Sequence, residues 1–479
     1  MQPDEPTKRP PVGRNLKRIF GLFGHYPALS ALSLLLVLAT TVGQLGGPLV
    51  IGWSVDYMVE QVAPEPAETT DPAPQGNTPK PSTTDRLRGP LLRGLGLRGD
   101  SVWTYVGLMV AVVLVRDISR FVGGLGRLAL TQRITGELRT RMFDKVQSLG
   151  FDYHDHTASG KVIARCTRDV ERIRRFISMP AFSSLEMILF MLGVGTLMTL
   201  TSPLLALVVA AFLPVSLGLI FFNSLRLGKL WKEASDRYGT LTTVLRENIS
   251  GARVVKAFAR EPEQITKFNT SSDSYVNQSI TATAFWAGRM PFAGFLFSLA
   301  TPVALVLGGY FTLRGWMTVG GVVLFLFYLR FLNHRIRMIG RLIESAQVAA
   351  ASAEGVFEVL EADEQVHEPD EARPVPPGPG RVTFENVSYH YDDDKGNGID
   401  DINLVIEPGQ KVAVIGPTGS GKSTLVGLVA RFRDPGSGRV LLDGVDLREY
   451  ALQPPRRSVA LVFQETFLFS MTLRENIRL

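Results

Sequence analysis

The residues with the most distinctive chemical potential form one glycine-rich run, Gly416-Pro417-Thr418-Gly419-Ser420-Gly421-Lys422-Ser423-Thr424. The run follows a short apolar stretch, residues 411–415, that is typical of a buried strand. It precedes residues 425–432, which are good helix formers. A strand, a glycine-rich loop and a helix in this order are the context that a phosphate-binding loop requires. The spacing therefore predicts a site for a polyphosphate.

Each residue type in the run has a physical role in such a site. Glycine at positions 416, 419 and 421 lets backbone amides turn inward with no Cβ in the way, and the following helix begins with amides that attract anions. Lys422 would place a positive charge at the β- and γ-phosphates. Ser423 would offer its hydroxyl to Mg²⁺, which prefers oxygen ligands. A nucleotide with Mg²⁺ is thus favoured over a merely structural glycine loop.

The elements that must position this loop belong to a chain of two contrasting parts. Hydrophobic content is 45% and charged content 20%, which are ordinary values for a globular protein. The distribution is not ordinary, because residues 27–55, 187–225 and 290–313 carry no charged side chain. The first run is too long for the apolar core of a cleaved signal peptide. These runs predict permanent membrane spans.

Six spans fit the sequence, since a helix needs about 20 residues to cross a bilayer. The run 187–225 is long enough for two helices and is divided by Thr201-Ser202-Pro203, which predicts a tight hairpin. Two of the predicted spans, 101–115 and 315–329, hold only 15 uncharged residues each. In these spans either Arg116 or Arg330 would snorkel toward the headgroups, or the helix would continue beyond the bilayer into water. The predicted spans are 27–55, 101–115, the two halves of 187–225, 291–313 and 315–329.

The basic residues orient these spans. The net charge of +6 would suit a nucleic-acid-binding protein, but the surplus lies beside the apolar runs. With a cytosolic N-terminus the inner segments hold 25 Lys and Arg against 6 outside, as the positive-inside rule requires. Both ends of the chain are therefore expected in the cytosol. The external loop 61–100 has a disordered composition, with a short ordered piece expected at 86–98.

Three isolated features have plain alternatives. Cys166 is the only cysteine, so an intramolecular disulfide is excluded and a free thiol is expected. Glu186 stands at the edge of the third span, where contact with a transported molecule competes with a position at headgroup level. His154 and His156 lack the further ligands of a metal site, so solvated histidines are favoured.

The C-terminal part reads as a separate α/β unit. Apolar alternation at Val382 and Phe384, and again at Ile402, Leu404 and Ile406, predicts two strands. The fold class is therefore an all-α polytopic membrane domain, with long cytosolic helical extensions, followed by a partial α/β P-loop nucleotide-binding domain. The domain boundaries that we predict are a cytosolic segment 1–25, a membrane domain 26–361, a linker 362–380 and the nucleotide-binding part 381–479.

The chain as a whole resembles a type I ABC exporter half-transporter. The resemblance rests on the glycine-rich loop together with Val387-Ser388-Tyr389-His390-Tyr391, Asp443-Gly444, Phe463-Gln464-Glu465-Thr466-Phe467-Leu468-Phe469-Ser470 and Glu475-Asn476-Ile477. It implies that Tyr391 stacks on the adenine of ATP, against the alternative of a strand-end core tyrosine. It implies that Gln464 senses Mg²⁺ and the γ-phosphate, against the alternative of a surface glutamine.

The same resemblance implies a mode of action in the lipid bilayer. Turns near residues 153–159 and 247–256 would be coupling helices that convey the nucleotide state to the spans, or else plain polar turns. The subunit would act as a homodimer or a heterodimer, and the sequence leaves both open. An amphipathic or lipid-like cargo is favoured over ions. A multi-pass protein of the bacterial plasma membrane is expected.

The family's hydrolytic groups lie further along than this sequence reaches. Leu479 is 57 residues beyond Lys422, and the resemblance places the signature motif, the acidic strand end, the catalytic glutamate and the switch histidine beyond that point. No catalytic residue is therefore predicted here, and whether the chain is an ATPase stays open. Three readings remain, namely an ATP-driven exporter subunit, a nucleotide-binding partner that does not hydrolyse ATP, and a fragment that does not fold.

Overall fold

The computed structural model describes residues 12–62, 83–94, 101–364, 366–369, 371, 373–374, 378–391, 398–464 and 467–478. Contacts divide the chain into two compact units. The helical unit comprises Met1–Gly136 and Glu171–Ala353. The C-terminal unit comprises Glu137–Val170 and Glu354–Leu479, so it includes a stretch from the middle of the sequence.

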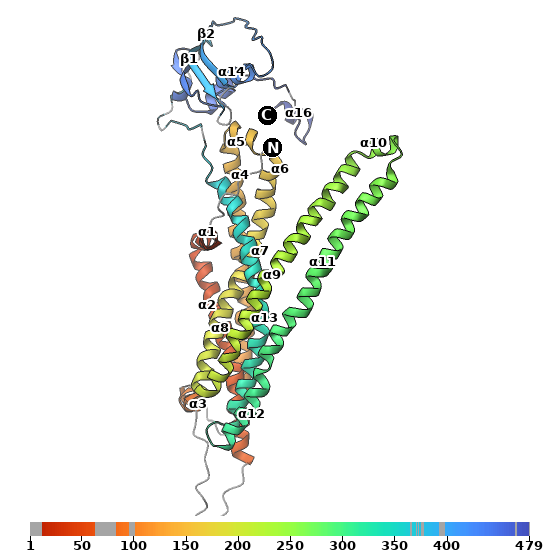
Figure 1. Cartoon of the computed structure of the whole chain (residues 1–479). Helices are drawn as coiled ribbons and strands as arrows, with labels where there is room; N and C mark the ends of the chain where they lie inside the picture. The colour runs from red at the N-terminus through yellow and green to blue at the C-terminus, as the bar shows by residue number, and fades with distance from the viewer. Residues whose placement is uncertain are drawn as a thin grey trace, which may run out of the picture. The chain divides into compact units, whose positions relative to one another are not determined.

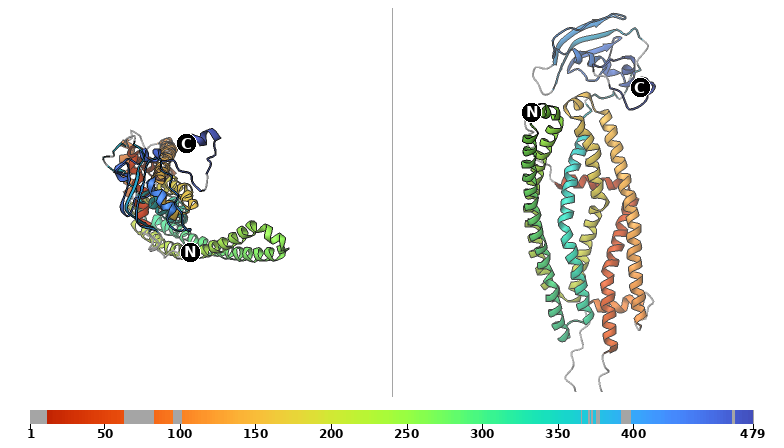
Figure 2. Two further views of the ribbon diagram at one scale, coloured as in Figure 1. Left: turned by 90° about the horizontal axis from the view of Figure 1, so that it is seen from above. Right: turned by 90° about the vertical axis from the view of Figure 1, so that its right-hand side faces the viewer.

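Long helices make up almost all of the helical unit (Figure 1). Helices α9 and α11 run side by side as an extended pair that is joined at one end by α10, as both figures show (Figure 2). The helices, several of which continue into the other unit, are α1 (Val12–Gly21), the 3₁₀ turn η1 (Leu22–His25), α2 (Pro27–Val62), α3 (Thr83–Gly94), α4 (Val102–Ser148), α7 (Val170–Ser178), α8 (Pro180–Thr201), α9 (Pro203–Ser250), α10 (Ala252–Ala257), α11 (Glu261–Ser298), α12 (Ala300–Leu313) and α13 (Val319–Leu360).

Five helical stretches of the described part are long and apolar enough to cross a membrane. The predicted span 101–115 falls in α4, which is not among them and becomes charged from Arg116 onward. The predicted hairpin is confirmed, because α8 ends at Thr201 and α9 begins with Pro203 after an extended Ser202. Proline can begin a helix but cannot continue one. The five stretches are Pro27–Val62, Ser159–Thr201, Pro203–Ser250, Glu261–Leu313 and Val319–Leu360.

The core of the helical unit gathers side chains from four of these stretches. Phe190 on α8, Val209 on α9, Phe297 on α11 and Phe325 on α13 are all at most 2% exposed. The helices also approach closely through glycine, since a Cβ on Gly320 of α13 would overlap the backbone and a carboxylate of α2. Small residues at such crossings are typical of packing between membrane helices.

Helix α3 accounts for the ordered piece expected at 86–98. Leu92 is buried against Trp53, Tyr57 and Tyr105 of α2 and α4. Arg88 donates a hydrogen bond of 2.7 Å from Nε to the Tyr105 hydroxyl. The helix begins at Thr83, three residues before the predicted piece, and the remaining residues of that loop, 63–82 and 95–100, lie outside the described part.

The C-terminal unit is built on an antiparallel sheet in the order β2-β1-β3-β4. Strand β1 (Val382–His390) lies between β2 (Gly398–Ile406) and β3 (Ser437–Leu442), with β4 (Val445–Asp446) at the edge. Phe384 pairs with Leu404 on one side and Val440 on the other, which confirms both predicted strands. The unit also contains α5 (Phe151–His156), α6 (Ser159–Ala164), the π-helical turn η2 (Arg165–Asp169), α14 (Lys422–Val429), the 3₁₀ turn η3 (Leu447–Glu449), α15 (Gln453–Ser458) and α16 (Leu473–Ile477).

The strand predicted at residues 411–415 is wrong. These residues form no strand, and Val414 and Ile415 are 45% and 92% exposed. An apolar stretch becomes a buried strand only when neighbouring strands complete its hydrogen bonds. No segment in the described part of the chain pairs with it. The apolar pattern therefore predicted neither the conformation nor the burial of this segment.

Candidate functional site

The glycine-rich loop turns sharply into helix α14. Gly419 and Gly421 have φ angles of +87° and +83°, in the left-handed region that favours glycine. A Cβ on Gly421 would also overlap the Ile399 side chain of β2. Gly419 and Gly421, two of the three glycines that the sequence analysis identified, thus have backbone conformations that favour glycine.

The N-terminus of α14 is open to an anion. Gly421 is the N-cap and supplies no side-chain hydrogen bond to the first turn. The first amides of a helix have no partner within the helix and carry the positive end of its dipole. A phosphate group placed there satisfies both the unpaired amides and the dipole. The residues of this loop therefore fit a nucleotide polyphosphate.

Lys422 folds back over the loop that precedes it. Its Nζ donates hydrogen bonds to the carbonyls of Gly416, at 3.0 Å, and Pro417, at 2.7 Å. The loop from Gly416 to Ser420, including Thr418, is exposed, and so is Ser423, whereas Lys422 itself is half-buried. A charge-assisted bond to a phosphate oxygen is stronger than a bond to a carbonyl, so an arriving phosphate can replace these contacts. The ammonium is already held at the loop where that charge is needed.

Tyr391 is brought to the same helix from the end of β1. Its hydroxyl shares a hydrogen bond of 3.0 Å with Oγ1 of Thr424, which is 6% exposed. The rings of Tyr391 and Tyr389 pack edge to face, with their centroids 5.2 Å apart. The guanidinium of Arg433 lies 5.1 Å from the Tyr391 ring centroid. The structure thus links the tyrosine to the phosphate loop, as an adenine-stacking residue would require.

Gln464 is not brought to the loop by any described contact. Its side chain is exposed and makes no hydrogen bond to a described residue. The preceding Phe463 stacks on Phe432, with ring centroids 6.3 Å apart and planes 10° apart. Residues 465–466 lie outside the described part. The Mg²⁺-sensing role of Gln464, like that of Ser423 as a Mg²⁺ ligand, stays a prediction.

Sequence reasoning missed a set of contacts between α5 and the sheet of the same unit. The Asp152 carboxylate accepts a 2.9 Å hydrogen bond from the Tyr389 hydroxyl and forms an ion pair with Arg433. Arg433 also pairs with Asp155, and Phe151 stacks on Phe432 with centroids 4.2 Å apart. Nothing in the local sequence marks these residues, because 281 positions separate Asp152 from Arg433.

The electrostatics of this contact favour the neutral tyrosine and the charged arginine. Burial, with the neighbouring Asp152 carboxylate, raises the pKa of the Tyr389 hydroxyl. Burial alone would lower the pKa of Arg433, but Asp152 outweighs it and the pKa is raised. The side chains of Arg433 and Asp152 are 11% and 17% exposed. The link is therefore a largely desolvated ion pair and not a surface contact.

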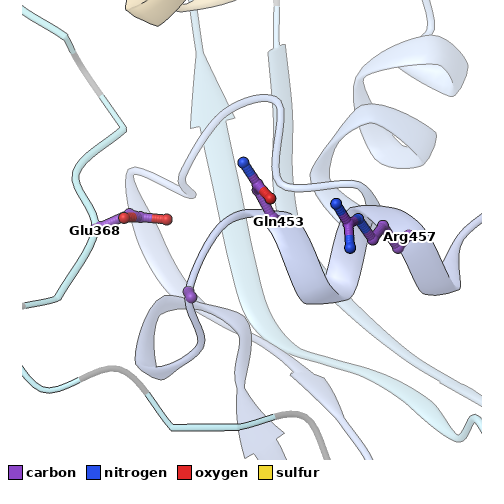
Figure 3. Close-up of a pocket in the computed structure, with 4 residues that line it drawn as sticks. Glu368, Gln453 and Arg457 are labelled. Atoms are coloured by element: carbon purple, nitrogen blue, oxygen red, sulfur yellow. The ribbon is translucent and has the colours of Figure 1, made fainter. Parts of the chain in front are cut away.

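A cavity of about 480 Å³ lies between α5 and the end of β1. Tyr391 and Arg433 line one side, and Asp152, Tyr153 and His156 line another. A second, shallower depression is lined by Glu368, Ala451, Gln453 and Arg457 (Figure 3). None of its lining residues belongs to the phosphate loop. The first cavity includes Tyr391 but, like the second, no residue of the phosphate loop.

Glu186 lies in a polar cluster of the helical unit. Its carboxylate forms an ion pair of 3.0 Å with Arg335 of α13 and accepts a hydrogen bond of 2.8 Å from Gln44 of α2. Both charged side chains are 18% exposed. The Arg335 guanidinium lies 4.3 Å from the ring centroid of Phe190. Glu186 thus forms a salt bridge with an arginine of the same unit.

Comparison with known proteins gives two family matches. The ABC transporter transmembrane region matches residues 30–336, and the ABC transporter family matches residues 399–478. A bacterial Atm1-family ABC exporter solved with ATP bound superimposes with a TM-score of 0.67 at 19% identity, covering 93% of this chain and 73% of that one. This last likeness concerns the fold.

Curated relatives agree with the family matches. An uncharacterised ABC transporter ATP-binding protein, YfiC of Bacillus subtilis, is 27% identical over 97% of this chain and 71% of its own length. A putative multidrug export ATP-binding/permease protein of the same organism, YgaD, is 31% identical over 81% and 67%. A fatty acid ABC transporter ATP-binding/permease protein of Mycobacterium tuberculosis is 35% identical over 72% and 54%. The chain thus spans between about half and seven-tenths of these relatives.

Proposed function

This chain belongs to the ABC transporters and has the membrane and ATP-binding regions of an exporter half-transporter, and from this premise we propose that it is one subunit of a dimeric exporter driven by ATP. Half-transporters of this family generally work as dimers. The observation that carries the proposal is the phosphate loop at the uncapped N-terminus of α14, in one compact unit with α5.

The loop residues have distinct parts in nucleotide binding. Backbone amides around Gly419 and Gly421 face the phosphates, and Lys422 exchanges its carbonyl partners for phosphate oxygens. Tyr391 offers its ring to the adenine. Ser423 and Gln464 hold Mg²⁺. ATP, when bound with this ion, supplies the negative charge and binding free energy that these groups recognise.

The contacts of α5 suggest how nucleotide binding reaches the spans. Arg433 lies near the Tyr391 ring and also pairs with Asp152 of α5. Helix α5 follows α4 after only Leu149 and Gly150, so a displacement of α5 is transmitted to a helix of 47 residues. ATP binds one arrangement of the dimer more tightly than the other, and that difference in affinity drives the switch from inward-facing to outward-facing.

The location and cargo follow from the same premise. The excess of Lys and Arg in the inner segments supports cytosolic ends, and the bacterial relatives support a bacterial plasma membrane. Relatives are named for multidrug and fatty acid transport and for flipping of lipid A-core. The chemistry that these names share is an amphipathic molecule, and we propose only this class of cargo for the present chain. The partner is a second copy or a similar half-transporter.

The proposal is tested by transport in reconstituted membranes. The protein as its gene encodes it is placed in proteoliposomes, and uptake of a fluorescent amphiphile is followed after ATP is added outside. Uptake is expected to require ATP and to be lost in Lys422→Ala. Lys411→Ala is the matched control, because Lys411 is exposed just before the loop and outside it. Equal uptake without ATP, or in Lys422→Ala, contradicts the proposal.

A further inference from the structure

The depth of each residue in the helical unit can be estimated from helix contacts. Asn333 of α13 donates a hydrogen bond to Ser298 of α11, and Gly340 of α13 lies level with Ser224 of α9. At 1.5 Å per residue, these two contacts place Arg226, Arg289 and Arg341 within a few ångströms of one level. Arg226 and Arg289 bound the apolar runs of α9 and α11 and therefore mark the inner headgroup region, and Arg341 lies at the same level.

Arg330 and His334 lie well above that level. They precede Arg341 by 11 and 7 residues on the same continuous helix, α13, which corresponds to about 17 and 11 Å toward the outer side. Helix α13 begins at Val319, about 17 Å from Arg330 in the other direction. With an apolar thickness of about 30 Å, Arg330 therefore stands near the middle of the bilayer.

The two side chains share a face and lack partners. Positions 330 and 334 are separated by one helical turn, and both residues are exposed. Neither makes an ion pair or a hydrogen bond with any described residue. Arg335, the next residue along α13, is different, since Glu186 neutralises it. Among the described basic side chains on this part of α13, Arg330 and His334 are the two that remain available to another molecule.

An exposed arginine at the middle of a bilayer cannot face the lipid. Charged side chains at this depth face the interior of a bundle or a water-filled path. The described acidic groups at comparable depth are already engaged, because Asp117 pairs with Arg116 and Glu186 pairs with Arg335. A second copy of this chain would bring the same engaged acids and further cations. Charge complementarity therefore points to an anion that is not part of the protein.

Apolar surface accompanies the two basic residues. Phe331 is 37% exposed beside Arg330, and Phe327 is half-buried on the preceding turn. A site with cations next to aromatic rings suits a molecule with an acidic headgroup and a hydrocarbon tail. An inorganic anion would gain nothing from the rings.

We propose that Arg330 and His334 bind the acidic headgroup of the exported molecule, which is an anionic amphiphile bearing a carboxylate or a phosphate on an acyl chain. The inference rests on the proposed export function, which it deepens by naming the substrate class. It assigns specificity to one face of α13, the helix labelled in Figure 1.

Binding without nucleotide tests the inference separately from export. The chain in dodecyl maltoside is titrated with oleate, oleyl phosphate and oleyl alcohol, which share one hydrocarbon chain and differ in headgroup, and affinity is followed by thermophoresis. At least one of the two acids is expected to bind about tenfold or more tightly than the alcohol, since hydrogen bonds to charged groups contribute that much. The stronger of the two shows whether the headgroup is a carboxylate or a phosphate.

Substitutions of Arg330 and His334 test whether these residues cause the preference for an acidic headgroup. Arg330→Gln is expected to reduce the preference for the acid to within about threefold, while Arg330→Lys keeps most of it because the charge remains. His334→Gln reduces it by a smaller factor and serves if Arg330→Gln does not fold. Lys232→Gln, an exposed charge on the inner extension of α9, is the matched control and leaves all three affinities unchanged.

The outcomes separate the inference from the export function. Equal affinities for the three amphiphiles, or an unchanged preference in Arg330→Gln and His334→Gln, overturn the inference. ATP-driven uptake of neutral amphiphiles with no effect of Arg330→Gln would also overturn it and leave export intact. Selective acid binding in a protein that shows no ATP-driven uptake would support the anion-binding role of Arg330 and His334 but contradict the proposed export function.

Discussion

The ion pair between Asp152 and Arg433 gives the sharpest test of how α5 is held in the C-terminal unit. With the two side chains only 17% and 11% exposed, removing one partner leaves a largely desolvated charge. Complete burial would cost about 3–5 kcal/mol, and the residual exposure lowers this to about 2–4 kcal/mol. Asp152→Ala also leaves the Tyr389 hydroxyl without its acceptor, which adds about 1 kcal/mol.

A double-mutant cycle measures the interaction itself. Asp152→Ala, Arg433→Ala and the double variant are compared by hydrogen exchange of the α5 amides, which reports the free energy of local opening. The double variant is expected to be less destabilised than the sum of the singles, with an interaction energy of about 1–3 kcal/mol. The two singles alone cannot show this, since each also removes other contacts.

An exposed ion pair of the same unit provides the control. Arg439 pairs with Glu385 across β1 and β3, but their side chains are 58% and 41% exposed. Arg439→Ala is therefore expected to cost less than about 1 kcal/mol. The reasoning is refuted if the cycle gives additive effects, or if Arg439→Ala opens the unit as much as Arg433→Ala does.

Three further predictions concern single residues. The Lys145 ammonium holds the pKa of the Glu364 carboxyl below its ordinary 4.5. This bond therefore stabilises the fold above that pH, and its contribution is lost as the pH falls through the lower pKa of the folded state. In Glu364→Gln, the thermal unfolding temperature between about pH 3 and 6 is expected to lose that part of its pH dependence. Gly320→Ala should destabilise the helical unit by about 1–3 kcal/mol because its Cβ would overlap α2, whereas Gly340→Ala, whose Cβ meets only one hydroxyl at 3.8 Å, should leave denaturation in detergent nearly unchanged. Tyr391→Phe should keep ATP-analogue affinity within about threefold and Tyr391→Ala should lose about tenfold or more, because stacking needs the ring and not the hydroxyl; equal losses would remove the stacking role.

The sequence predicted best those features that depend on neighbouring residues. The break between α8 and α9 follows from Pro203, and the left-handed turns at Gly419 and Gly421 follow from the glycines themselves. Strands β1 and β2 follow from alternating apolar residues such as Phe384 and Leu404. In each case a period or a special backbone conformation is written in a few adjacent positions.

Features that depend on distant partners could not be predicted in this way. The apolar residues 411–415 have the pattern of a strand, but pairing depends on segments elsewhere in the chain. The pairing of Glu186 with Arg335 joins positions 149 residues apart, and that of Asp152 with Arg433 joins positions still further apart. Charge patterns suggest that such residues have partners but do not say which.

Nucleotide affinity at the glycine-rich loop tests the central claim most directly. Fluorescence of trinitrophenyl-ATP is titrated against the purified chain in detergent, with Lys422→Ala and the control Lys411→Ala measured beside it. The parent chain and Lys411→Ala are expected to bind with the same affinity, while Lys422→Ala binds about tenfold or more weakly because a charge-assisted hydrogen bond to phosphate is lost. Equal affinity in all three proteins would contradict the assignment of the phosphate site to this loop.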